Sequence, residues 1–132
     1  MKVIPDTPIW FQVLRREKPN LSISNLMANL IEDGLVYLAG IIKQELLSGV
    51  RVEKQFNTLA SHLQTFPELL ASTEDHLIAA EFFNKCQRSG IQGSHVDFLI
   101  VALAKHHSAK IITTDKDFQK YRTVIDFDLQ LV

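Results

Sequence analysis

Two aspartates in this sequence closely follow short apolar runs that have the length of strands. Asp6 comes directly after residues 2–5, and Asp115 comes two positions after the β-branched run at residues 110–113. If both runs are central strands of one parallel sheet, their carboxyl ends lie at the same edge, and so do the two carboxylates. Ligands of α/β proteins bind at such an edge, which makes it the first place to expect chemistry.

Two further acids occur in helical stretches that are otherwise apolar. Asp97 is followed one turn later by Ile100 and Val101, and Glu45 shares its side of a helix with two isoleucines one turn earlier. A carboxylate on a buried helix face is disfavoured unless it is paired, hydrogen-bonded or bound to a metal. Asp97 in particular is therefore a candidate for a functional carboxylate, and Glu45 is a second one.

Each acid also has a simpler structural explanation. Asp6 and Asp115, or the threonine beside each, could cap a following helix, because aspartate and threonine are favoured caps. Asp97 stands three residues after Ser94, as in a capping box, although glutamate is more usual at that position. Glu45 could lie on the rim of an amphipathic helix. The sequence leaves both explanations open at each position.

The four acids taken together suggest phosphate chemistry. Carboxylates brought within a few ångströms repel one another and raise one another's pKa. A hard divalent cation relieves this repulsion, and oxygen-only ligands suit Mg²⁺ or Mn²⁺. Such metal sites hydrolyse or transfer phosphates. Spacing alone does not establish that the acids converge.

The elements that must position these acids alternate along the chain. The expected strands cover residues 2–5, 35–39, 110–113 and 124–132. The expected helices cover residues 8–16, 25–32, 41–47, 52–63, 73–88, 94–107 and 117–121. Strands separated by helices predict an α/β fold, in which helices cover both faces of a central parallel sheet.

Length and composition narrow the class of protein. The 132 residues fit one domain, and a hydrophobic fraction of 46% predicts a self-supporting core. The longest wholly apolar run, residues 98–104, is far shorter than the roughly 20 residues that a membrane span needs. The single cysteine, Cys86, cannot form an intrachain disulfide, and no secretion signal is apparent. We therefore expect a cytoplasmic protein without a membrane segment.

The formal net charge of the chain is close to zero, but it becomes positive when the four candidate acids are left out of the count. The formal net charge is −1, from 14 basic and 15 acidic residues. If the four candidate acids bind a metal, the rest of the chain is mildly basic, which is compatible with nucleic acid. Arg15 and Arg16 lie in a basic cluster near the start, which could equally be a solvated helix end.

Four short motifs resemble, in order and spacing, those of PIN-domain ribonucleases. The run IPDTPIW at residues 4–10 resembles the opening I-D-T-S-x-W of that family, and IKQELLSG at residues 42–49 resembles its second acidic motif. The run DFLIVA at residues 97–102 resembles D-x-x-I-A-A, and IITTDKDF at residues 111–118 resembles L-x-T-x-D-x-D-F. The small size points to the toxin members of VapBC-type toxin–antitoxin pairs.

The resemblance implies a role for individual residues. It implies a PIN-like three-layer sandwich and an Mg²⁺-dependent endoribonuclease, with Mn²⁺ as a substitute ion. The metal-binding and catalytic acids would be Asp6, Glu45, Asp97 and Asp115. The accessory residues would be Asp117, Thr7 and Thr113. Residues that could hold the RNA backbone are Arg15, Arg16 and Lys116. Proline at position 8 and valine at position 101 depart from the residues common in the family.

The resemblance also implies partners. An RNA substrate, a cognate antitoxin protein and a homodimer are expected. The helix expected at residues 73–88 has more apolar surface than one buried face needs, and part of it could contact a partner. The alternative is a catalytically silent PIN module that acts through a protein partner or through passive RNA binding. A phosphoryl-accepting receiver domain fits less well, since the chain lacks paired acids after its first strand.

Overall fold

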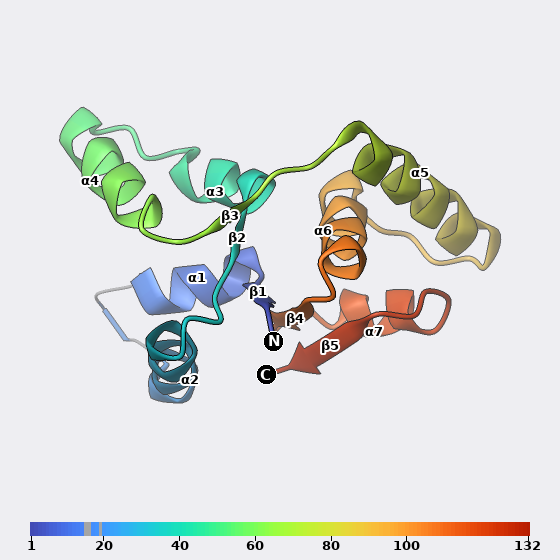
Figure 1. The fold of residues 1–132 in the computed structure, drawn as a ribbon, viewed down its shortest axis with the longest axis horizontal. Helices are drawn as coiled ribbons and strands as arrows, with labels where there is room; N and C mark the ends of the chain where they lie inside the picture. The colour runs from blue at the N-terminus through green and yellow to red at the C-terminus, as the bar shows by residue number, and fades with distance from the viewer. Residues whose placement is uncertain (15–16, 19) are drawn as a thin grey trace.

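Parallel strands form the centre of the molecule, flanked by helices. The computed structural model describes residues 1–14, 17–18 and 20–132. The strands are β1 (Val3–Pro5), β2 (Leu38–Ala39), β3 (Glu68–Leu69), β4 (Lys110–Thr113) and β5 (Asp128–Leu131). The helices are α1 (Thr7–Leu14), α2 (Leu21–Glu32), α3 (Gly40–Leu47), α4 (Glu53–Leu63), α5 (Thr73–Arg88), α6 (His95–His106) and α7 (Asp117–Arg122) (Figure 1).

The sheet order places β4 between β1 and β5, all parallel. Ile4 of β1 is in register with Ile111 of β4, and Ile111 with Leu129 of β5. Strands β2 and β3 form a second parallel pair, and a single bridge from Val36 to Val3 connects that region to β1. Because β1 and β4 run the same way and in register, their carboxyl ends meet at one edge.

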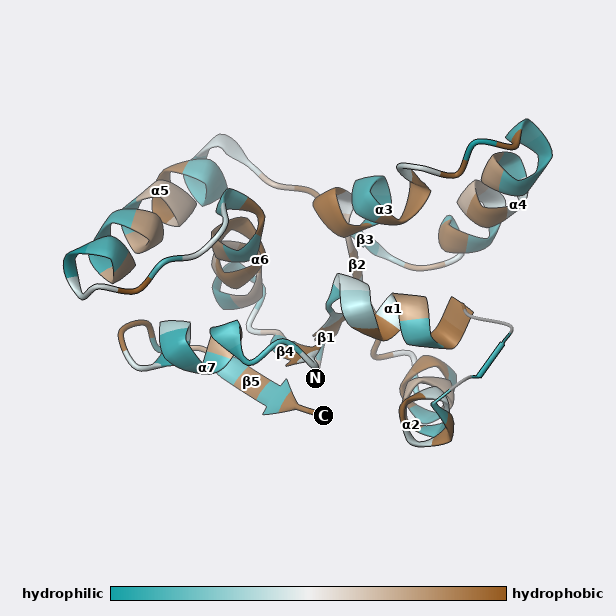
Figure 2. Cartoon of the chain, turned by 180° about the vertical axis from the view of Figure 1, so that it is seen from behind, coloured by the Kyte–Doolittle hydropathy of each residue, from teal (hydrophilic) through white to brown (hydrophobic). Residues whose placement is uncertain are grey.

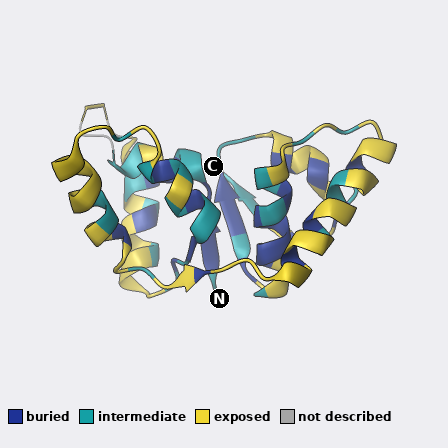
Figure 3. Cartoon of the chain, turned by 90° about the horizontal axis from the view of Figure 1, so that it is seen from above, coloured by how far each residue is buried: buried dark blue, intermediate teal, exposed yellow. Residues whose placement is uncertain are grey.

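Helices cover both faces of the sheet, as expected for an α/β fold. Helices α1 and α6 both contact β4, and Figure 3 shows the buried strands between two groups of helices, α1–α4 on one side and α5–α7 on the other. The predicted three-layer α/β arrangement is confirmed. Figure 2 shows hydrophilic and hydrophobic residues mixed along α4 and α5, as amphipathic outer helices require.

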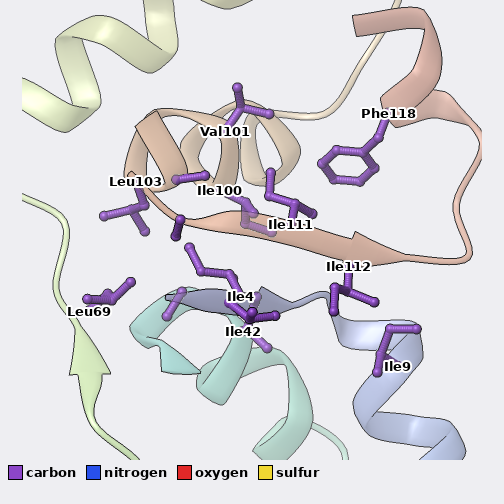
Figure 4. Close-up of a cluster of buried hydrophobic side chains, with 14 of the residues drawn as sticks. Ile4, Ile9, Ile42, Leu69, Ile100, Val101, Leu103, Ile111, Ile112 and Phe118 are labelled. Carbon is purple, nitrogen blue, oxygen red and sulfur yellow. The ribbon is translucent and has the colours of Figure 1, made fainter. Parts of the chain in front are cut away.

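The core lies on both faces of β1 and β4. Short strands rich in β-branched residues, such as KIIT in β4, suit a sheet buried on both faces. Figure 4 shows the side chains that fill this core, all of them buried: Ile4, Ile9, Ile42, Leu69, Ile100, Val101, Leu103, Ile111, Ile112 and Phe118. Helix α6 is buried along most of its length, so the apolar run after Asp97 is core.

Several element boundaries differ from those expected. Helix α2 begins at Leu21, four residues early, because the Asn20 side chain caps it by accepting the Ile23 amide at 3.1 Å. Helix α1 begins at Thr7, and the last two residues of the helix expected at 8–16 lie outside the described residues. Strand β3 was not predicted, since its two residues lack any alternating pattern. Among the described helices, none combines the length and hydrophobicity needed to cross a membrane.

A buried aspartate joins the start of α5 to the end of α6. Asp75 accepts the Ser72 amide at 2.9 Å while the Ser72 hydroxyl accepts the Asp75 amide, which forms a complete capping box. The other carboxylate oxygen of Asp75 lies 2.9 Å from Nδ1 of His106. Burial alone would raise the pKa of Asp75, but the hydrogen bonds from Ser72 and His106 outweigh burial and hold the pKa below its usual value.

We expect Asp75→Ala to lower the free energy of unfolding by about 2–3 kcal/mol at pH 7, because α5 loses its cap and α6 loses its tether. Since the pKa of Asp75 is lowered by folding, its contribution is present above about pH 4 and is lost as the pH falls through the lowered pKa. Urea denaturation at pH 7 and pH 3 measures both effects. The exposed neighbour gives the control Glu74→Ala, and equal midpoints for wild type and Asp75→Ala would contradict the prediction.

Candidate metal centre

The parallel pairing of β1 and β4 positions Asp6 beside Thr113. The Asp6 amide donates to the Ile112 carbonyl at 2.8 Å, which continues the ladder one residue beyond β1. The Thr113 hydroxyl then donates to Oδ2 of Asp6 at 2.8 Å and accepts the Asp115 amide at 3.0 Å. Asp6 is only 5% exposed. One buried threonine therefore links the first acid of the chain to the last of the four.

Glu45 reaches this edge from helix α3 through Thr7. The Thr7 hydroxyl, at the start of α1, donates to Oε1 of Glu45 at 2.9 Å. Thr7 directly follows Asp6, so the contact fixes α3 against the carboxyl end of β1. Glu45 is half-buried, as expected for a residue on the rim of an amphipathic helix. Its carboxylate also accepts a hydrogen bond that joins α3 to α1.

Asp97 lies in the first turn of α6 and contacts an aromatic side chain of α7. Its amide donates to Oγ of Ser94 at 3.0 Å, so Ser94 caps the helix as the sequence suggested. Its carboxylate oxygen Oδ2 accepts the Tyr121 hydroxyl at 2.7 Å. Sequence analysis did not single out Tyr121, which lies in the mostly polar run DFQKYR; the available signal was its spacing of three from Phe118, which places both rings on one helix face, where a buried tyrosine hydroxyl needs a partner.

The residues around Asp115 organise the start of α7. Oδ1 of Asp115 accepts the Asp117 amide at 2.9 Å and so satisfies one amide at the start of the helix, although the N-cap position itself is Lys116, whose side chain makes no capping bond. Asp117 is exposed and lies 3.6 Å from the Nζ of Lys120. Lys116, expected to hold RNA, is exposed between the two aspartates. Arg15 and Arg16 lie outside the described residues.

Three of the acids interact electrostatically. The pKa of Asp6 is raised to about 6, chiefly by burial and to a smaller extent by the nearby charges of Asp97 and Asp115. Hydrogen bonds from Thr113 and from the Thr7 amide oppose this rise. The raised pKa shows that Asp6 is held, without a compensating charge, in surroundings that disfavour its ionised form.

Asp97 is in a similar position. Burial raises its pKa, the Tyr121 and Ser94 hydroxyls oppose the rise, and the charges of Asp115 and Asp117 add to it. Burial and the adjacent Asp97 carboxylate also raise the pKa of Tyr121, so its hydroxyl keeps its proton at neutral pH and is the donor in this contact.

The donor set is suitable for a hard divalent cation. All four side chains are carboxylates, and the ion pairs formed by the described residues, Lys43–Glu68, His106–Asp75 and Lys120–Asp117, involve none of them. Among the described residues, no three Asp, Glu, His or Cys side chains are close enough together to hold a metal ion as they stand. A cation would therefore have to draw these acids closer together. Its positive charge would offset the repulsion between the carboxylates that this approach increases.

Comparison with known proteins establishes the family. The PIN domain family model matches residues 3–124, and the chain therefore belongs to the PIN-domain family. The fold is similar to that of FitAcB from Neisseria gonorrhoeae, with 25% identity over 96% of this chain and 95% of that chain and a TM-score of 0.78.

Two more distant structures share the same fold. VapBC2 from Rickettsia felis, bound to a DNA fragment from its promoter, has 16% identity over 100% of this chain and 99% of that chain, with a TM-score of 0.81. VapBC-1 from nontypeable Haemophilus influenzae has 20% identity over 99% and 98% of the two chains, with a TM-score of 0.79. No match was found among curated protein sequences.

We expect Asp6→Asn to stabilise the protein at pH 7.5 in the absence of divalent cations, by up to about 3 kcal/mol. In the unfolded chain Asp6 loses its proton near pH 4, whereas in the folded chain it does so near pH 6. Between these values the unfolded chain binds fewer protons, so the stability of the wild type falls as the pH rises. The variant has no such loss, and the difference should close near pH 4.

Thermal and urea unfolding with a chelator present, at pH 4, 6 and 7.5, measure this difference. Asp33→Asn, at an exposed position after α2, is the matched control and should follow the wild type at every pH. A variant of Asp6 that is less stable than the wild type at pH 7.5 would show that its charge is compensated in the folded protein.

Proposed function

We propose that this chain is an Mg²⁺-dependent endoribonuclease, the toxin of a type II toxin–antitoxin pair of VapC type. The observation that carries the proposal is the buried, uncompensated Asp6 at the carboxyl end of β1, with Asp97 and Asp115 near enough to raise its pKa. A protein that needed only a helix cap would gain nothing from gathering like charges. Membership of the PIN-domain family is consistent with this chemistry.

The proposed roles follow from the contacts. Asp6, Glu45, Asp97 and Asp115 would hold the metal ion, with Mn²⁺ as a substitute. When bound, the cation would supply positive charge to phosphoryl oxygens and lower the pKa of a bound water. The residues Thr7 and Thr113 orient two of these carboxylates by donating hydrogen bonds to them.

The residues proposed to contact RNA are not among the four metal-binding acids. Lys116, exposed beside Asp115, would contact the RNA backbone, and Asp117 would serve as the accessory acid. Arg15 and Arg16 are proposed for the same contact from the sequence alone. A toxin–antitoxin complex from Klebsiella pneumoniae is among the structures with a similar fold, and we propose a small antitoxin as the partner of this chain. A homodimer and a cytoplasmic location complete the proposal.

The purified protein is expected to cleave mixed cellular RNA with Mg²⁺ or Mn²⁺ and to stop when a chelator is added. Asp6→Asn and Asp97→Asn should each lower the cleavage rate at least about a hundredfold, because each removes a proposed metal ligand. Mapping of the new RNA ends identifies the cleaved sequence. Circular dichroism shows whether each variant is folded.

Matched controls separate this activity from the alternative. Glu53→Gln, in the exposed first turn of α4, should cleave like the wild type. Mg²⁺ should also raise the melting temperature of the wild type by mass action. A folded Asp6→Asn or Asp97→Asn variant that cleaves at the wild-type rate would disprove the site. The absence of both chelator-sensitive cleavage and a melting shift would favour a silent module that acts through a protein or passive RNA contact.

Lys116→Ala is expected to weaken RNA binding a few-fold and to reduce the slope of log affinity against log salt by about 1, because one phosphate contact is lost. The measurement is RNA binding by catalytically impaired Asp97→Asn protein at several salt concentrations. Lys54→Ala, also exposed but on α4, is the control. Arg15→Ala and Arg16→Ala test the two arginines in the same way. A Lys116 variant with an unchanged salt slope would remove this residue from the proposed interface.

A further inference from the structure

We infer that Tyr121 is a positioning residue for the Asp97 carboxylate, and that Gly93 supplies the space in which the tyrosine ring reaches it. The inference rests on the proposed function and adds two residues to it. It follows from one hydrogen bond, the packing of one ring and one close backbone approach.

The hydrogen bond joins α7 to the first turn of α6. The Tyr121 hydroxyl donates to Oδ2 of Asp97 at 2.7 Å, a short contact of the kind formed with an ionised acceptor. The Asp97 backbone is already held by the cap from Ser94. Because its amide and one carboxylate oxygen are both hydrogen-bonded, the Asp97 side chain has little conformational freedom left. Its other carboxylate oxygen, Oδ1, does not accept the Tyr121 hydroxyl.

Aromatic packing holds the hydroxyl in place. Tyr121 is 1% exposed. Its ring lies 4.8 Å from that of Phe98 and 5.3 Å from that of Phe118, centroid to centroid. Phe98 directly follows Asp97 in the chain, so the same helical turn supplies both the acid and the ring against which its donor packs. The direction of the hydroxyl is thus determined by the core.

Gly93 is the point where the loop before α6 approaches these rings. A Cβ atom at this position would lie 2.7 Å from the rings of Phe98 and Tyr121. Carbon atoms at this distance clash, since their optimal separation is about 3.5–4.0 Å. Both rings are buried, so neither can swing into solvent. Any other residue at position 93 must displace one of these rings or the loop itself, and displacement of Tyr121 moves its hydroxyl away from Asp97.

A purely structural role makes a different prediction. A core tyrosine needs a hydrogen-bond partner wherever it is buried, and loss of its hydroxyl would then affect only stability. A positioning role predicts an effect on cation affinity as well, because residues that orient a metal ligand typically change metal affinity by 10–100-fold when removed. Cation affinity is therefore the deciding measurement.

The test compares Tyr121→Phe with Tyr37→Phe, which alters the only other tyrosine of the chain. The ring of Tyr37 lies beneath the Nζ of Lys2, 5.4 Å from the centroid. Mn²⁺ affinity is measured by calorimetry on folded protein without RNA. We expect Tyr121→Phe to weaken Mn²⁺ binding about tenfold or more, with Tyr37→Phe unchanged. Equal or tighter Mn²⁺ binding by Tyr121→Phe would overturn the inference, whatever happens to its melting temperature.

Gly93→Ala tests the space requirement. We expect a loss of Mn²⁺ affinity in the same direction as Tyr121→Phe, and little further loss when the two changes are combined. Gly40→Ala is the control, because a Cβ at that position meets its neighbours at 3.5 Å or more. If Gly93→Ala binds Mn²⁺ like the wild type, the role of Gly93 is disproved. If it fails to fold, the requirement for space is upheld and Tyr121→Phe alone decides the positioning role.

The outcomes also distinguish this inference from the proposed function. A wild-type chain that binds no Mn²⁺ and cleaves no RNA overturns both. A wild-type chain that does both, with an unchanged Tyr121→Phe variant, overturns only the positioning role and leaves the four-carboxylate site standing.

Discussion

Parallel pairing of β1 with β4 is the constraint on which the rest of the structure depends. Asp6 and Thr113 are separated by 107 positions, yet register brings the end of one strand against the end of the other, and their side chains lie 2.8 Å apart. Helix α1 starts from this edge, α7 follows it closely, and α6 packs against β4. A shift of this pairing by one residue would turn Thr113 to the opposite face of the sheet and separate it from Asp6.

The acids at this edge oppose the stability of the fold. Burial and mutual repulsion disfavour the ionised forms of Asp6 and Asp97, whereas the threonine, serine and tyrosine hydroxyls around them favour these forms. The result is a set of carboxylates that are oriented by neutral donors and left with unneutralised charge. Strain of this type is concentrated at functional sites, and the well-packed core around β1 and β4 can support it.

Another buried aspartate, Asp75, has a pKa shift of the opposite sign. Asp75 is as buried as Asp6, but it accepts hydrogen bonds from Ser72 and His106, and its pKa is lowered. That acid stabilises the junction of α5 and α6. The two aspartates thus differ in the sign of their pKa shift: burial and the nearby like charges of Asp97 and Asp115 outweigh the hydrogen bonds at Asp6, whereas the hydrogen bonds from Ser72 and His106 outweigh burial at Asp75. This difference separates a structural acid from a candidate functional one.

The sequence by itself predicted the fold class, which the structure confirms, and it proposed four acids as metal ligands, which stay a prediction. Apolar runs at strand length, helical periodicity and glycine at helix ends are local signals, and within the described residues they predicted each helix and each strand except β3, although they missed the Asn20 cap that starts α2. Local signals could not decide between a helix-start residue and a metal ligand at Asp115, because the residue that accepts an amide at the start of α7 also lies just beyond the end of β4. Only the tertiary structure decided which hydroxyls hold which carboxylates. The contacts of Tyr121 with Asp97 and of Thr7 with Glu45 span 24 and 38 positions, and no periodicity encodes them, because the packing of separate helices against one sheet alone sets such distances.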